Sequence, residues 1–114
     1  MKSIISIFLI IGSFGYAQFA FSACNYPKMN INIPNGAKAT MEEMVAAQSN
    51  FKAYNADMDA YLVCLDDELS KISEDFEGYG DIKRVSDDKY NAAIDQLTAA
   101  AEEWNQAVRA YKAQ

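Results

Sequence analysis

Apolar residues recur at every third or fourth position from Met41 onward. This spacing places them along one side of an α-helix and predicts a first helix over residues 41–76. Ala47, Tyr54 and Tyr61 widen the apolar stripe enough for a globular bundle. The predicted heptad seam consists of Met41, Met44, Gln48, Phe51, Asn55, Met58, Leu62, Leu65, Leu69 and Ile72.

The start of this helix carries its own signal, because Thr40 is followed three residues later by Glu43. A hydroxyl and a carboxylate at this spacing form a capping box, in which each side chain accepts a hydrogen bond from the other residue's backbone amide. The seam also contains two polar residues, Gln48 and Asn55. Buried polar residues at seam positions can fix the register, while exposed ones simply face water. Both interpretations stay open.

Two glycines at positions 78 and 80 follow the first predicted helix and indicate a connection over residues 77–86. Ser86, followed by Asp87 and Asp88, is a typical helix start, because the hydroxyl caps backbone amides and the acids suit the positive end of the helix dipole. We therefore expect a second helix over residues 87–112. Its apolar seam consists of Tyr90, Ile94, Leu97, Ala101, Trp104, Val108 and Tyr111.

Residues 24–40 differ from both helices, since they contain both prolines of the chain. Each proline restricts the residue before it to extended geometry, so this segment is predicted to be an extended arm. Met29, Ile31 and Ile33 alternate with asparagines, which lets one side of the arm lie on an apolar surface. The tripeptide at 34–36, Pro-Asn-Gly, is a turn sequence.

Together these patterns predict an all-α fold, an antiparallel two-helix hairpin with an extended N-terminal arm. Two long helices joined by a short connection pack side by side. Two helices and an arm leave one flank of a broad seam thinly covered. A homodimer that forms a four-helix bundle is therefore a further expectation.

The first 23 residues have the layout of a secretory signal peptide, with Lys2 followed by an apolar run over residues 4–11 and a small residue at Ala23. The run is about eight residues long, well short of the roughly 20 that a helix needs to cross a bilayer. Cleavage after Ala23 would leave a chain of 91 residues that begins at Cys24. We expect a periplasmic or secreted protein.

The charge of residues 24–114 limits the classes of partner, because nine basic and 16 acidic residues give a net charge of −7. Nucleic acids are not expected as partners, since their phosphates are bound by clustered Lys and Arg. Electrostatic adhesion to an anionic membrane surface is not expected either. A membrane would be a partner only if Cys24 were lipidated.

Cys24 and Cys64 are the two cysteines of the chain, and in an oxidising compartment they are expected to form a disulfide. Cys64 lies roughly 36 Å along the first helix from its cap, and the arm can span roughly 53 Å, so the arm can run back to it. Lipidation is the alternative, because the residues before Cys24 approach a lipobox. Phe21 stands where that motif usually has Leu.

The run IPNGAKATMEEMVAAQ at residues 33–48, with Tyr54, Tyr61 and the triplet Cys-Leu-Asp at 64–66, resembles a family of short uncharacterised exported helical proteins of Gram-negative bacteria. The similarity covers most of the chain after residue 23. It implies a location in the Gram-negative envelope and a pairing of Cys24 with Cys64. It brings no assigned activity.

No enzymatic activity is expected, because the chain has no histidine, the commonest general base, and its two thiols are expected to be paired. No cofactor and no metal site are expected. Phe76, at the end of the first predicted helix, and Tyr79, in the predicted connection, form a candidate contact loop, since Tyr79 lies between glycines and outside any seam.

The leading hypothesis is a non-enzymatic envelope protein that acts by protein–protein contact through its helical surface or this loop. A lipid-anchored envelope lipoprotein is the second hypothesis. The third is a helical module that binds a small ligand or a metal with its Tyr and Met side chains.

Overall fold

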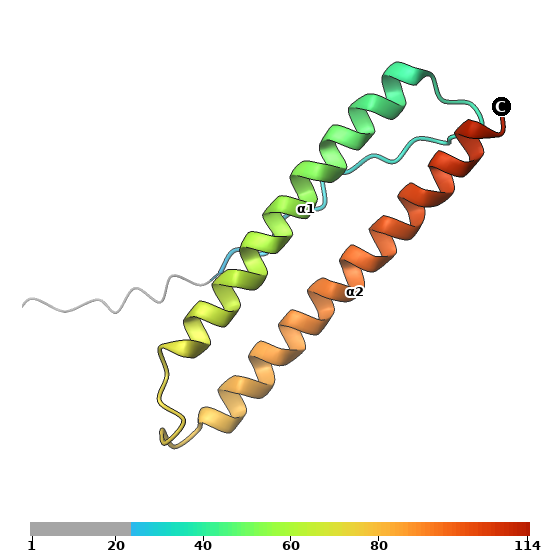
Figure 1. Cartoon of the computed structure of the whole chain (residues 1–114). Helices are drawn as coiled ribbons and strands as arrows, with labels where there is room; N and C mark the ends of the chain where they lie inside the picture. The colour runs from blue at the N-terminus through green and yellow to red at the C-terminus, as the bar shows by residue number, and fades with distance from the viewer. Residues whose placement is uncertain (1–23) are drawn as a thin grey trace, which may run out of the picture.

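The computed structural model describes residues 24–114 as two helices and an extended arm. Helix α1 runs over Met41–Ser70 and helix α2 over Tyr79–Lys112. The two helices lie side by side and antiparallel, and the arm runs along them toward the end where α1 begins (Figure 1). The prediction of an all-α hairpin is confirmed. The predicted signal peptide, residues 1–23, lies outside the described residues.

Helix α1 begins where the sequence predicts, at a capping box built by Thr40 and Glu43. The Glu43 backbone amide donates to the Thr40 hydroxyl at 3.2 Å, and the Thr40 amide donates to the Glu43 carboxylate at 2.8 Å. These bonds satisfy two of the amides that a helix leaves without partners at its start. The cap thereby fixes the point at which the arm turns into the helix.

The predicted end of the first helix at Phe76 is wrong, because α1 ends at Ser70. The last turn of α1 contains no basic residue, and Asp66 and Asp67 lie near its carboxyl end, where the helix dipole disfavours negative charge. Beyond it, Ser73 closes a tight turn by accepting from the amides of Asp75 and Phe76. This local hydrogen bonding replaces the helical ladder that the apolar spacing suggests.

The predicted connection over 77–86 and the predicted start of the second helix at 87 are also wrong, since α2 begins at Tyr79. Its cap is Gly78, whose φ of +99° is a left-handed conformation that glycine adopts without strain. Ser86 is not the cap, and Asp87 lies inside the helix, where it pairs with Lys83 at 2.6 Å. The glycines that suggested a long connection instead stand at the start of the helix.

The core lies where the two helices and the arm meet. On α1, Met58 is completely buried and Tyr54, Tyr61, Leu62 and Leu65 are nearly so, which confirms the middle of the predicted seam. The polar seam residues Gln48 and Asn55 are exposed, so they face water and do not fix register in the core. Met41, the first residue of the predicted seam, is 64% exposed.

The buried side of α2 is lined by small residues, with Ala93, Ala100 and Ala107 at intervals of seven. The predicted seam centres on larger side chains, but Ile94 is 39% exposed whereas Ala93 is completely buried. The large aromatic Trp104 is half-buried and stacks on Phe51 of α1, with ring centroids 6.2 Å apart. The buried face is thus rotated toward a row of alanines, which lets other backbone approach closely.

The arm contacts both helices. Ile31 packs on the cluster around Met58, and Ile33 packs on the cluster of Met44 and Ala107, which confirms the predicted alternation for these two residues. A turn follows the arm, but it lies over residues 36–38 and not 34–36, since Asn35 accepts hydrogen bonds from the amides of residues 37 to 39. None of the helices over residues 24–114 is long and apolar enough to cross a membrane.

Gly36 explains why the turn can lie so close to α2. A Cβ atom at this position would be 1.9 Å from the Ala107 carbonyl oxygen, so any side chain would collide with helix backbone. The side-chain amide of Gln114 donates to the carbonyls of Gly36 and Ala39, which ties the end of the chain to the turn. The arm is therefore held at both of its ends, here and at Cys24.

Candidate functional site

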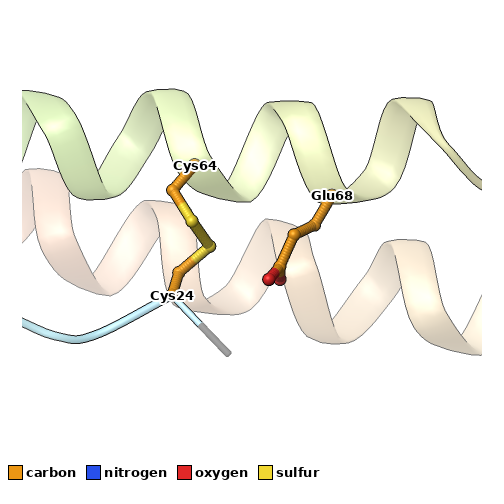
Figure 2. A group of neighbouring side chains, drawn as sticks. All are labelled: Cys24, Cys64 and Glu68. Atoms are coloured by element: carbon orange, nitrogen blue, oxygen red, sulfur yellow. A yellow bond between two sulfur atoms is a disulfide. The ribbon is translucent and has the colours of Figure 1, made fainter. Parts of the chain in front are cut away.

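Two parts of the molecule are candidates for a functional site: the disulfide that attaches the arm, and the end of the hairpin where apolar side chains are exposed. The first is the covalent attachment of the arm, where Cys24 and Cys64 form a disulfide with a Cα–Cα distance of 5.8 Å (Figure 2). The predicted pairing is confirmed. Both cysteines are half-buried, and the bridge closes a loop across a separation of 40 residues. By the chain-entropy estimate, such a bridge stabilises the fold by about 3 to 4 kcal/mol.

The disulfide also bears on location and lipidation. Structural disulfides persist in oxidising compartments, whereas cytosolic thiols are kept reduced, so the bridge fits a protein outside the cytoplasm. The bridge uses the thiol of Cys24 that a lipid chain would have to modify. A thiol cannot form a thioether to a lipid and a disulfide at once. The structure therefore favours a disulfide at Cys24 over a lipid anchor at the same residue.

Glu68 lies one helical turn after Cys64 and directs its carboxylate toward the bridge (Figure 2). A carboxylate oxygen and the two sulfurs all lie within 4.8 Å of one another. Metal ions bind thiolates, and sulfurs joined in a disulfide are not thiolates, so the oxidised trio lacks the ligands of a zinc site. The negative carboxylate also repels an incoming thiolate. This arrangement suits a lasting structural bridge.

An aromatic group lies beside the bridge. Tyr26 of the arm packs edge-on against Tyr61 of α1, with ring centroids 5.1 Å apart. Burial raises the pKa of Tyr61 and Tyr54 above the usual value near 10, and the neighbouring Tyr26 raises both further. The Tyr54 hydroxyl is buried and has no hydrogen-bond partner among the described residues. Tyr54 and Tyr61 therefore stay neutral at physiological pH and act as packing groups.

The second place is the hairpin tip, which we define as residues 66–88. It contains both residues of the predicted contact loop, and the structure separates their roles. Phe76 lies in the connection between the helices and is 56% exposed. Tyr79 is the first residue of α2 and is half-buried, so its predicted place in a loop is wrong. Only Phe76 remains as a prominently exposed aromatic at the tip.

Two further apolar residues of the tip were missed in the sequence, Ile82 and Val85, which are 38% and 44% exposed. The sequence prediction placed both in a connection, where a periodic pattern carries no meaning. In α2 they lie three residues apart, and residues at this spacing share a helix face. The same spacing could have revealed them, had Gly78 been recognised as the start of the helix.

The tip also holds most of the net charge. Residues 66–88 contain nine acidic and three basic residues, a net charge of −6, whereas the rest of residues 24–114 has a net charge of −1. All three basic residues of the tip are engaged in ion pairs there: Lys71 with Asp67, Lys83 with Asp87, and Arg84 with Asp81 and Asp88. The tip therefore presents exposed apolar side chains within a strongly negative surface.

No protein-family model, curated protein or solved structure matches this chain. The resemblance to exported proteins of Gram-negative bacteria stays a prediction. What this protein does has to be argued from the bridge and the tip.

Proposed function

We propose that this protein is an exported, non-enzymatic protein of the Gram-negative envelope that acts by contact with another protein through its hairpin tip. The observation that carries the proposal is the exposure of Phe76, Ile82 and Val85 at one end of the molecule. We call these three residues the tip patch. Exposed apolar side chains gathered in one place are typical of interaction sites.

The rest of the described structure supports this proposal. The arm, the alanine row of α2 and the disulfide hold two helices of 30 and 34 residues side by side. We call the end where α1 begins and α2 finishes the closed end. The tip lies at the opposite end of the hairpin (Figure 1). Rigid presentation lowers the entropy that binding would otherwise cost.

The proposed function can be tested by placing a photo-crosslinking amino acid at single positions of the chain expressed in a Gram-negative host. We expect Phe76 to give a discrete adduct with another protein. Val45 is the matched control, since it is 54% exposed but lies near the other end of α1. If Phe76 gives no adduct with a protein, or if Val45 and Val63 give the same adduct as Phe76, contact through the hairpin tip is wrong.

Export and the state of Cys24 can be tested in the same cells by the intact mass of the purified protein. We expect a periplasmic chain that begins at Cys24 and weighs two hydrogens less than its reduced form. A mass increased by a diacylglycerol would instead identify a lipoprotein. A cytoplasmic chain that keeps residues 1–23 would contradict export.

A further inference from the structure

We infer that the tip patch binds a cationic segment of a partner protein, one in which Lys or Arg side chains are interleaved with apolar ones. This inference rests on the proposed function and names the chemistry of the partner. Its starting point is that the three residues of the patch form one continuous row.

The continuity of the row follows from contacts around Gly78. The ring of Phe76 lies 3.7 Å from the position that a Cβ atom of Gly78 would occupy. The amide of Ile82 donates to the Gly78 carbonyl at 3.1 Å, so Ile82 stands one turn further along the same side of α2. Val85 follows three residues later on that side. The row therefore covers the connection and the first two turns of the helix.

The tip patch continues the face of α2 that is buried elsewhere. Ile82 lies eleven residues before Ala93, which is three helical turns, so both residues point to the same side of α2. Ala93 is completely buried, whereas Ile82 is 38% exposed. Ala93 belongs to a cluster formed with α1 and the arm, whereas α1 ends at Ser70 and the described arm starts at Cys24 and leads away from the tip (Figure 1). No arm residue from 24 to 40 is available to cover the patch.

The charge around the patch selects the partner. Five acidic residues of the tip form no ion pair within residues 24–114, and they are Asp66, Glu68, Glu74, Asp75 and Glu77. Three of them flank Phe76 within the connection. A partner surface that is apolar but negatively charged would meet these carboxylates at close range and be repelled. A segment that carries Lys or Arg would neutralise them while its apolar side chains cover the patch.

Charge also argues against two other occupants. An anionic lipid surface would be repelled by the same carboxylates that attract a cationic segment. A second copy docked symmetrically, tip to tip, would bring together two surfaces that each carry a net charge of −6. A cationic partner segment is the occupant that fits both the apolar row and its surroundings.

The inference can be tested with three fluorescent peptides of equal length, built from Lys and Ile, from Lys and Ser, and from Glu and Ile. Anisotropy is measured with the purified oxidised protein at low and at physiological ionic strength. We expect the Lys–Ile peptide to bind, more tightly at low salt, and the other two to bind at least about tenfold more weakly. Equal binding of either control peptide would overturn the inference, because it would show that the positive charge or the apolar side chains of the partner are not needed.

Matched variants locate the binding site. Phe76→Ser is expected to weaken the Lys–Ile peptide about tenfold, the loss typical of a central aromatic contact, while Val45→Ser changes binding by less than about twofold. Neutralising residues 74, 75 and 77 by E74Q, D75N and E77Q is expected to weaken binding and flatten its salt dependence. The control D59N, D95N and E103Q removes the same charge elsewhere. Equal effects of the two triple variants would contradict a site at the tip.

The failures of the two proposals can be told apart. If crosslinks form at Phe76 in cells but none of the peptides binds preferentially, the protein contact stands and the cationic partner is wrong. If Phe76 gives no crosslink to a protein in cells, the proposed contact through the hairpin tip is itself wrong. Light scattering completes the test, because a dimer that disappears in Phe76→Ser would identify a second copy as the occupant and overturn the inference.

Discussion

The two ends of the hairpin are built from the same two helices but differ in how they are covered. At the closed end, α1 begins and α2 finishes around the turn of the arm, and Ala39, Met44 and Ala107 are buried together. At the tip, the helices are joined by residues 71–78 without the arm, and Phe76 and Val85 are 56% and 44% exposed. The arm makes the difference between the two ends.

This comparison shows how a small chain can combine stability with an exposed apolar surface. A domain of this size buries a limited core, and a third segment packed along two helices adds to it. Because the arm is clamped at Cys64 and at the closed end, its contribution is confined to that part of the molecule. The tip contributes no residue to the two buried clusters, and the apolar side chains of the tip patch stay exposed.

The largest effect is expected from cutting the clamp with Cys24→Ser together with Cys64→Ser. Without the bridge the unfolded chain gains freedom, and the free energy of unfolding should fall by about 3 to 4 kcal/mol. Urea denaturation followed by circular dichroism measures this loss. Val63→Ser, next to the bridge and 67% exposed, is the control and should change stability by less than about 0.5 kcal/mol. An unchanged midpoint in the double variant would show that the arm does not depend on its covalent attachment.

A smaller loss is expected from Gly36→Ala at the closed end. The new methyl group would collide with the backbone of α2 at Ala107, and relieving such overpacking typically costs about 1 to 3 kcal/mol. Gly80→Ala is the matched control, because a Cβ atom there meets nothing within 4 Å. This control should stabilise the protein by up to about 1 kcal/mol, since alanine favours a helix over glycine. Equal effects of the two substitutions would contradict the close approach of the turn to α2.

Thr40→Ala removes one half of the capping box and should lower the free energy of unfolding by about 1 kcal/mol. Thermal melting followed at 222 nm is a suitable measurement. Ser86→Ala is the control, because Ser86 lies inside α2 and does not cap it. A larger loss from Ser86→Ala than from Thr40→Ala would show that Ser86 caps the second helix, as the sequence predicts, and would contradict a start of α2 at Tyr79.

The fourth effect is confined to alkaline pH and tests the middle of the hairpin, where Tyr26 of the arm meets α1. Because the pKa of Tyr54 and Tyr61 is raised by burial, the folded state holds their protons more tightly than the unfolded state. The contribution of these two protonated tyrosines to the free energy of unfolding is complete below pH 10. It is lost as the pH rises above 10 and through their raised pKa. Unfolding by urea at pH 8 and pH 11 should show this loss, and Tyr54→Phe should reduce it. An equal loss in Tyr54→Phe would contradict the burial of that hydroxyl.

The smallest effect on stability is expected at the tip itself. Phe76→Ser should change the free energy of unfolding by less than about 0.5 kcal/mol, because the ring is largely exposed. Met58→Ala, completely buried at the centre of the core, should cost about 2 to 5 kcal/mol by the same denaturation measurement. If Phe76→Ser proved as costly as Met58→Ala, the tip would belong to the core and the comparison between the two ends would fail.

The class of fold, the arm and the position of the first helix start follow from local patterns in the sequence. Periodic apolar spacing, two prolines and a capping box are local signals, and the structure contains each corresponding element. The disulfide could also be anticipated, because the chain has two cysteines and the extended arm is long enough to run from Thr40 back to Cys64. These features depend on neighbours in the chain or on a simple length.

Packing between distant segments sets the face that α2 buries, whereas the helix ends at the tip depend on local features at Ser73 and Gly78 that the apolar spacing does not show. A glycine such as Gly78 usually indicates a break in a helix, yet here its left-handed conformation caps the start of α2. Ile82 and Val85 therefore lie on a helix, where both are exposed on the same face. The row of Ala93, Ala100 and Ala107 is buried because the arm and α1 approach it closely, and no periodicity within α2 announces that neighbour. Contacts between distant segments depend on how they fit in space, and local spacing does not encode that fit.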